Sequence, residues 1–238
     1  LERGKVLTIV GESGSGKTTV IRALMGLLPV GGEVTEGTLL FNGKDLRNLS
    51  KDEWRSIRGK DMAMIFQDSG SALDPIVRIG KQFRELFKAH IEISNDECDR
   101  RAIELLESVA LPNCADILCR YPHELSGGQR QRVGIAMALA LDPALLIGDE
   151  PTSALDVTTQ SQVVMQMMEL SKVHNSAIVM VTHNLGVAAY MSDYIIVMKK
   201  GRVVDAGTPQ EILENPSNEY TKQLKDAVPT LGGGRYID

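Results

Sequence analysis

The chain has 238 residues, of which 43% are hydrophobic and 24% are charged; these values exclude a disordered or fibrous chain. A formal net charge of −5 argues against a generally basic surface that coats nucleic acid. The longest apolar stretch, Val133 to Gly148, is interrupted by Asp142 and Pro143, so no membrane span and no signal peptide is expected. Cys98, Cys114 and Cys119 form no CxxC pair and are expected to be the reduced thiols of a cytosolic protein.

The first elements in chain order form a strand, a glycine-rich loop and a helix. Lys5 to Val10 is a β-like run that ends at Gly11, and Lys17 to Leu28 is predicted to be a helix that stops before Pro29. Thr38 to Phe41 and Met62 to Phe66 are short apolar strand candidates.

The middle of the chain has a helical period. Ile79, Phe83 and Phe87 recur at helical spacing, and Ser94 to Glu97 has the pattern of a capping box ahead of another helix. Residues 71–136 are therefore predicted to be a mainly helical insertion between strand–helix units.

Strand patterns return in the last third of the chain. The four candidates are Leu145 to Ile147, Ala177 to Thr182, Ile195 to Met198 and Arg202 to Ala206. Val157 to Val173 is predicted to be an amphipathic helix, and a second capping box begins at Thr208. Alternating strands and helices predict an α/β fold with a mainly parallel sheet covered on both faces.

Gly11 to Thr18 (GESGSGKT) fits the phosphate-loop pattern G-x-x-x-x-G-K-[ST], between a strand and a helix. The glycines let backbone N–H groups point at phosphate oxygens, and the helix adds the positive end of its dipole. Lys17 is the candidate for the β- and γ-phosphates, and the Thr18 hydroxyl is a candidate Mg²⁺ ligand. The alternative is a glycine-rich turn with a surface lysine.

Asp149 and Glu150 follow the apolar strand candidate at residue 145. Asp149 is a candidate Mg²⁺ ligand, and Glu150 is a candidate base for the attacking water. Taken alone, such an acidic pair is more often a helix cap or a loop.

Leu125 to Gln129 (LSGGQ), within Tyr121 to Arg132 (YPHELSGGQRQR), resembles the signature of ATP-binding-cassette (ABC) ATPases. Ser126 can cap a helix whose first amides, at Gly127 and Gly128, carry no bulky side chain and form a second anion site. The alternative is a simple capped helix. The resemblance implies that this end acts on the ATP held by another subunit.

The remaining motifs of that family follow in order. Gln67 resembles the Q-loop glutamine, which touches Mg²⁺ and the lytic water, and His183 resembles the switch histidine at the γ-phosphate. Ser153, Ala154, Leu155 and Asp156 resemble the D-loop of the dimer interface. The resemblance also implies nucleotide contacts from every residue of the phosphate loop and the next: Gly11, Glu12, Ser13, Gly14, Ser15, Gly16, Lys17, Thr18 and Thr19.

The implied fold is a P-loop NTPase (RecA-like) core with an inserted helical subdomain. Residues 1–70 and 137–214 would form the core lobe, 71–136 the helical subdomain and 215–238 a C-terminal tail. The family places antiparallel strands and an adenine-stacking aromatic before Lys5, which this sequence does not contain. We therefore expect weaker nucleotide binding and an exposed sheet edge.

Leu27 to Asp45, Ile57 to Asp68 and the tail Asn215 to Pro229 resemble the ATPase subunits of peptide and nickel importers. Many relatives carry a cysteine cluster in that tail, but this chain has no cysteine after Cys119, so an iron–sulfur site is not supported. The tail's alternative role is a terminal helix packed on the core.

The resemblance implies an ATP- and Mg²⁺-dependent ATPase that powers import of peptides or nickel. Its partners would be a second ABC ATPase subunit, membrane permease subunits and, indirectly, an extracytoplasmic substrate-binding protein, which places it at the cytoplasmic face of the membrane. Three alternatives stay open: an exporter or lipoprotein-release ATPase, a soluble ABC ATPase that acts on nucleic acid, and a binding module without turnover.

Overall fold

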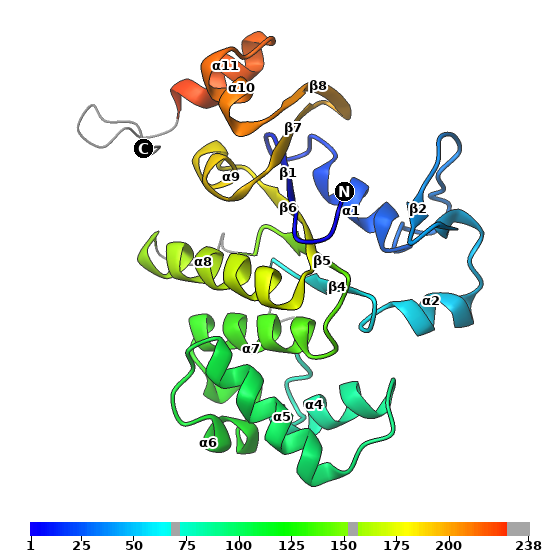
Figure 1. Cartoon of the computed structure of the whole chain (residues 1–238), viewed down its shortest axis with the longest axis vertical. Helices are drawn as coiled ribbons and strands as arrows, with labels where there is room; N and C mark the ends of the chain where they lie inside the picture. Colours follow the sequence, from blue (N-terminus) through cyan, green and yellow to red (C-terminus); the bar gives the residue numbers. More distant parts are fainter. Residues whose placement is uncertain (68–71, 152–156, 228–238) are drawn as a thin grey trace. The chain divides into compact units, whose positions relative to one another are not determined.

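The computed structural model describes residues 1–67, 72–151 and 157–227 (Figure 1). It divides into two compact units, which are considered separately. Unit 1 is Leu1–Trp54 with Ala177–Asp238, and unit 2 is Arg55–Ser176. The core, helical and tail boundaries derived from the motifs remain a prediction.

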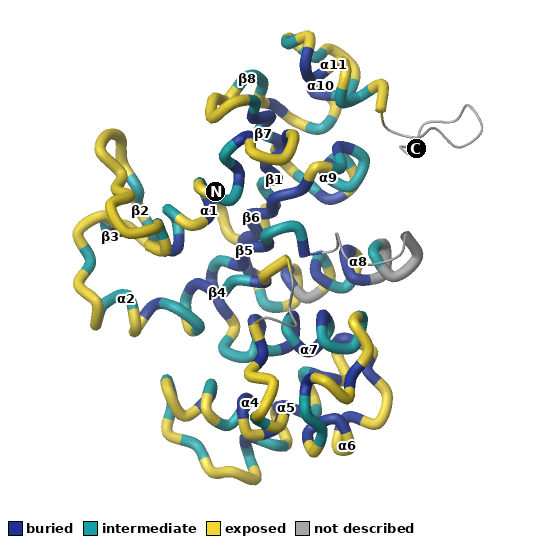
Figure 2. Tube along the Cα trace, turned by 180° about the vertical axis from the view of Figure 1, so that it is seen from behind, coloured by how far each residue is buried: buried dark blue, intermediate teal, exposed yellow. Residues whose placement is uncertain are grey.

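Unit 1 contains a four-stranded portion of sheet. Its order is β6 (Ala177–Thr182), β1 (Val6–Val10), β7 (Tyr194–Lys199) and β8 (Arg202–Gly207). β1 is parallel to β6 and β7, whereas β8 is antiparallel to β7. All of β6 and most of β1 are buried (Figure 2), which explains why both read as continuous apolar runs. The mainly parallel α/β fold is thus confirmed.

Helices cover this sheet on both sides. In Figure 1, α1 (Lys17–Leu24) and α9 (Leu185–Met191) lie on opposite sides of β1 and β6. α10 (Pro209–Glu214) and α11 (Glu219–Asp226) follow β8. The predicted capping box is present: the Glu211 amide donates to Thr208 Oγ1, and the Thr208 amide donates to the Glu211 carboxylate. One apolar cluster joins β1, α9, β7, α10 and α11; its buried members are Val10, Leu185, Ala188, Ile195, Val197, Ile212 and Tyr220.

Two predicted boundaries in unit 1 were wrong. α1 ends at Leu24, before Leu28, because Gly26 adopts a φ of 61° and the Leu27 amide donates back to the Arg22 carbonyl at 2.7 Å. The strand expected from Thr38 shrinks to β2 (Leu40–Phe41), which pairs antiparallel with β3 (Lys44–Asp45) across Asn42-Gly43. Both turn residues have positive φ, as a tight hairpin requires.

Unit 2 is mainly helical, as predicted for 71–136. In the described part of this unit, strands β4 (Met62–Ile65) and β5 (Leu145–Asp149) are parallel. Its helices are α4 (Ile79–Lys88), α5 (Asn95–Ser108), α6 (Cys114–Cys119), α7 (Gly127–Leu139) and α8 (Val157–His174), with α2 (Lys51–Ile57) at the unit boundary and 3₁₀ turns at Leu46–Asn48 in unit 1 and Pro122–Glu124 here. Among the helices described, not one has both the length and the apolar character needed for a membrane crossing.

The start of α5 follows half of its predicted capping box. Ser94 Oγ accepts a hydrogen bond from the Glu97 amide. The Glu97 carboxylate, however, pairs with Arg100 and Arg101 on the next turn. Two guanidinium groups offer a carboxylate stronger, charge-assisted bonds than one backbone amide, and they hold the pKa of Glu97 at about 2.

A buried pair of serines fixes the strand that leads to Asp149. Ser176 Oγ donates to the Pro143 carbonyl at 2.6 Å, and Ser171 Oγ donates to the Ser176 carbonyl at 2.6 Å. Both serines are almost fully buried, and Pro143 lies just before β5. The end of α8 is thereby tied to the start of β5.

Ser176→Ala leaves the buried Pro143 carbonyl without this donor. We expect a loss of about 1–3 kcal/mol in the free energy of unfolding, measured as a lower midpoint in urea denaturation. Ser108→Ala, at an exposed helical position, is the control and should stay within about 0.5 kcal/mol of wild type. Equal midpoints for the two variants would contradict this assignment.

Candidate functional site

The loop between β1 and α1 is folded tightly against the end of β7. A Cβ at Gly11 would lie 2.2 Å from the Met198 carbonyl oxygen, so only glycine fits there. Gly16 is the N-cap of α1 with a φ of 98°, a conformation that glycine adopts without strain. The loop therefore ends by presenting the first amides of α1, the arrangement that binds phosphate at helix N-termini.

Lys17 is held against this loop. Its Nζ donates to the carbonyl oxygens of Gly11, at 2.7 Å, and Glu12, at 2.8 Å, and the side chain is buried. Ser15 Oγ is also buried and has no hydrogen-bond partner in the described part of the chain. A positive charge and an unsatisfied polar atom beside helix amides fit an anionic ligand.

His183 and the phosphate loop lie at the same end of the sheet in unit 1. Val10 at the end of β1 pairs with Thr182 at the end of β6, so Gly11 and His183 follow neighbouring parallel strands. His183 is exposed. The next residue, Asn184, caps α9 by accepting hydrogen bonds from the Gly186 and Val187 amides. This cap fixes the backbone beside His183.

In unit 2, the two parallel strands bring three predicted residues to one end. Ile65 pairs with Gly148, so Gln67 after β4 and the Asp149–Glu150 pair at the end of β5 emerge side by side. Gln67 is exposed, and both acids are half-buried. Glu150 has a φ of 45°, a left-handed conformation that is uncommon for a residue with a side chain.

The LSGGQ segment forms the start of α7, as predicted. Ser126 is the N-cap: its Oγ accepts from the Gln129 amide at 3.2 Å, and Gln129 Oε1 accepts from the Ser126 amide at 2.9 Å. Arg130 donates to the Leu125 carbonyl. The reciprocal hydrogen bonds between Ser126 and Gln129 fix the start of α7. The first two residues of the helix, Gly127 and Gly128, have no side chains to cover their amides.

One residue of the signature region to which the sequence motifs assign no role connects two of these features. Gln131 on α7 is buried, and its Nε2 donates to the Pro151 carbonyl at 2.5 Å. Pro151 follows Glu150, so the signature helix supports the turn that carries the acidic pair. A glutamine at helical spacing with buried Ile135 and Ala138 was the signal available in the sequence.

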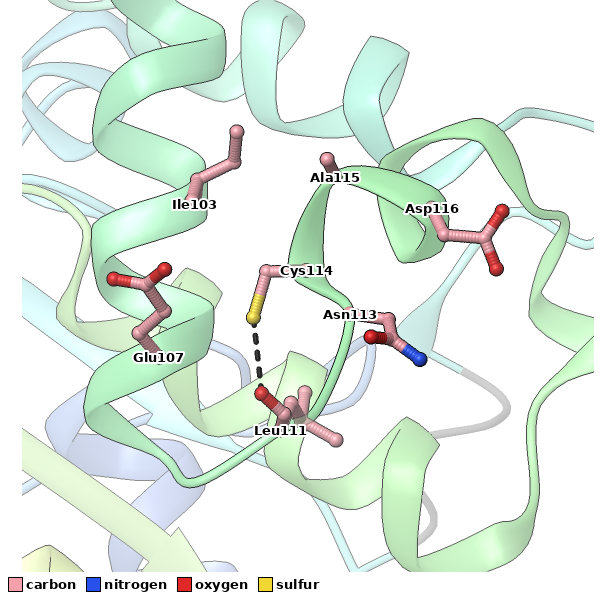
Figure 3. A pocket seen from close by; sticks show the side chains of 7 residues that line it. All are labelled: Ile103, Glu107, Leu111, Asn113, Cys114, Ala115 and Asp116. Carbon is pink, nitrogen blue, oxygen red and sulfur yellow. Dashed lines mark hydrogen bonds between the residues drawn. The ribbon is translucent and has the colours of Figure 1, made fainter.

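The predicted D-loop, Ser153 to Asp156, lies outside the described residues. A separate hollow of about 520 Å³ in unit 2 is lined by Ile103, Glu107, Leu111, Asn113, Cys114, Ala115 and Asp116 (Figure 3). None of the predicted site residues lines it. Burial raises the pKa of the Cys114 thiol, whose Sγ donates to the Leu111 carbonyl (Figure 3), so this cysteine is not an activated nucleophile.

Each unit, considered by itself, carries an oxygen donor of a kind that Mg²⁺ accepts. These are the Thr18 hydroxyl at the end of the phosphate loop and the Asp149 carboxylate at the end of β5. Across residues 1–67, 72–151 and 157–227, no three His, Cys, Asp or Glu side chains gather as a metal site. Mg²⁺ needs no such cage, because it is commonly held by one or two carboxylates together with substrate phosphates and water.

Comparison with known proteins identifies the family of this chain. The family model described as "ABC transporter" matches residues 1–153. The dipeptide transport ATP-binding protein DppD of Lactococcus lactis is 48% identical over 97% of this chain and 66% of its own length. The oligopeptide transport ATP-binding protein OppD of Bacillus subtilis is 47% identical over 97% of this chain and 65% of its own. The chain thus spans just under two thirds of the length of these relatives.

A solved structure extends the likeness to the fold. A dimeric ATP-binding cassette, MJ0796, in a post-hydrolysis state with ADP and Pi, superposes with a TM-score of 0.77 and 31% identity over 88% of this chain and 87% of its own. The α/β P-loop fold expected from the motifs is confirmed. By the family match, the relatives and the residues of the phosphate loop and signature helix, the chain belongs to the ABC transporter family.

Proposed function

We propose that this chain is the ATP-binding and ATP-hydrolysing part of an ABC importer that powers peptide uptake through a membrane permease. The observation that carries the proposal is the Gly11–Thr18 loop, with Lys17 held over it and α1 starting at its end. The peptide assignment is supported by relatives named for dipeptide and oligopeptide transport. Nickel import, the other cargo that the tail resembles, has no such support among them.

In the proposed reaction the loop amides and Lys17 bind the phosphates of ATP. We assign Thr18, Gln67 and Asp149 as the residues that would hold Mg²⁺, which would supply neutralisation of the phosphate charge. Glu150 accepts a proton from the attacking water. His183 contacts the γ-phosphate and thereby distinguishes ATP from ADP.

The signature helix supplies the second half of the mechanism. α7 presents the Gly127 and Gly128 amides, and a helix N-terminus attracts anions. We assign it to the ATP held by a second ABC subunit, whose own helix would complete the site in return. The D-loop residues 153–156 are assigned to the same interface. Hydrolysis removes the γ-phosphate contacts and allows the pair to open.

Import also requires partners outside this chain. We assign it to the cytoplasmic face of the membrane, bound to permease subunits and acting indirectly with an extracytoplasmic substrate-binding protein. The assignment is supported by the mainly helical unit 2, which contains both Gln67 and the signature helix.

Lys17→Ala should lower ATP affinity by at least about ten-fold, because a charge-assisted contact with phosphate contributes roughly 1.5–3 kcal/mol. The measurement is a titration with a fluorescent ATP analogue. Lys172→Ala, at an exposed lysine of α8, should bind as wild type does. Unchanged ATP affinity in Lys17→Ala would contradict the assignment of this loop to phosphate binding.

Glu150→Gln should keep ATP binding and lose hydrolysis by about 10²–10⁴-fold, because the amide cannot accept the proton from water. Phosphate release at saturating ATP measures the rate of hydrolysis. Size-exclusion chromatography in the presence of ATP reports whether the variant protein accumulates as a closed dimer. Glu92→Gln, at an exposed site, is the matched control. Full-rate hydrolysis by Glu150→Gln would exclude Glu150 as the base.

The cargo is tested in source cells that lack the gene. Uptake of a labelled dipeptide should fall and be restored by the wild-type gene but not by the Glu150→Gln gene, whereas uptake of labelled nickel should be unchanged. Loss of nickel uptake alone would identify the cargo as nickel and not as peptides. Such a result would leave the ATPase assignment intact.

A further inference from the structure

The C-terminal helix α11 contacts the phosphate loop directly. Tyr220 Oη accepts a hydrogen bond of 2.8 Å from the backbone amide of Glu12, 208 residues earlier in the chain. Glu12 is the second residue of the loop, immediately after the constrained Gly11. The contact lies wholly within unit 1.

Tyr220 is held in place on several sides. Its side chain is buried, 7% exposed, in the apolar cluster that also contains Val10, the last residue of β1. The Lys199 ammonium, at the end of β7, lies 4.3 Å from the ring centroid, within the range of a cation–π interaction. The phenol therefore has a fixed position from which to fix the Glu12 amide.

The start of α11 is anchored separately. The Asp205 carboxylate on β8 accepts hydrogen bonds from the Ser217 amide, at 3.0 Å, from the Ser217 hydroxyl, at 2.8 Å, and from the Asn218 amide, at 3.2 Å. Burial acts to raise the pKa of Asp205, but the hydrogen bonds, Ser217 first, outweigh it and bring the pKa below its ordinary value. An ionised carboxylate thus anchors the segment that leads into Tyr220.

The same region supports the loop at a second point. The Gly201 amide, in the turn between β7 and β8, donates to the Ser15 carbonyl at 3.0 Å. The carbonyl of Met198 on β7 lies against Gly11. The C-terminal part of the chain therefore contacts the loop at both Gly11 and Ser15. Lys17 makes a separate set of hydrogen bonds, to the carbonyl groups of the loop itself.

We propose that Tyr220 is a positioning residue of the nucleotide site: α11, through the Tyr220 hydroxyl, holds the phosphate loop in the shape that binds ATP. The proposal rests on the proposed function, since it needs the loop to bind nucleotide. A preorganised loop does not spend binding free energy on ordering itself. Loss of the Tyr220–Glu12 hydrogen bond therefore lowers nucleotide affinity through the shape of the loop.

The test is Tyr220→Phe in the complete protein, which retains the ring and its contact with Lys199 and removes only the acceptor oxygen. Tyr190→Phe, at a tyrosine that is 60% exposed, is the matched control. We expect Tyr220→Phe to weaken ATP and ADP binding by about two- to ten-fold, the effect of one hydrogen bond. Amide hydrogen exchange should accelerate at Glu12 and its neighbours in the loop.

A purely structural role predicts a different pattern. It would lower the thermal midpoint and accelerate exchange in α11 while leaving nucleotide affinity unchanged at temperatures where the variant is folded, and this result would overturn the proposal. Failure of the wild type itself to bind ATP would instead refute the proposed function. The two failures are therefore distinguishable in one titration series.

Asp205→Asn provides a second variant along the same route. It weakens the anchor at Ser217 and Asn218 without altering Tyr220, and it should lower ATP affinity in the same direction. In the Tyr220→Phe background it should add little, because the contact it acts through is already lost. Fully additive losses, or accelerated exchange in α11 with unchanged affinity, would contradict coupling through Tyr220.

Discussion

The described structure depends on one constraint at the end of β1: the chain must turn so that it can present backbone amides to an anion. That turn requires Gly11, which has no room for a side chain beside the Met198 carbonyl, and Gly16, which enters α1 from the left-handed region. Lys17 closes the turn through two carbonyl groups. The parallel β1–β6 pair then determines that His183 leaves the sheet at the same end.

The motifs of this fold could be predicted from the sequence because the residues of each motif lie close together along the chain. The phosphate loop, the capped signature helix and the Asp149–Glu150 turn each depend on residues within about ten positions of one another, and each was found in the element expected. The end of α1 differs from the expectation based on Pro29 because Gly26, with its positive φ, ends the helix earlier. The Asn42-Gly43 pair between β2 and β3 is a dipeptide typical of tight hairpins.

Contacts between distant segments could not be predicted in this way. Tyr220 and Gln131 are each a single polar residue whose partner, Glu12 or Pro151, is a backbone group far along the chain. Backbone groups carry no residue identity, so neither pairing leaves a pattern in the sequence. What the sequence offers in such cases is a polar side chain at a buried position, which says that a partner exists without saying where it is.

Glu150 illustrates how function and stability oppose each other in this protein. Its left-handed backbone costs a side-chain-bearing residue on the order of 1 kcal/mol or more, and glycine would relieve that cost. A laboratory selection for heat resistance alone would therefore favour glycine at position 150 and would discard the carboxylate assigned to water activation. A stabilised variant would therefore keep Glu150, with its strained backbone, only if activity were selected together with stability.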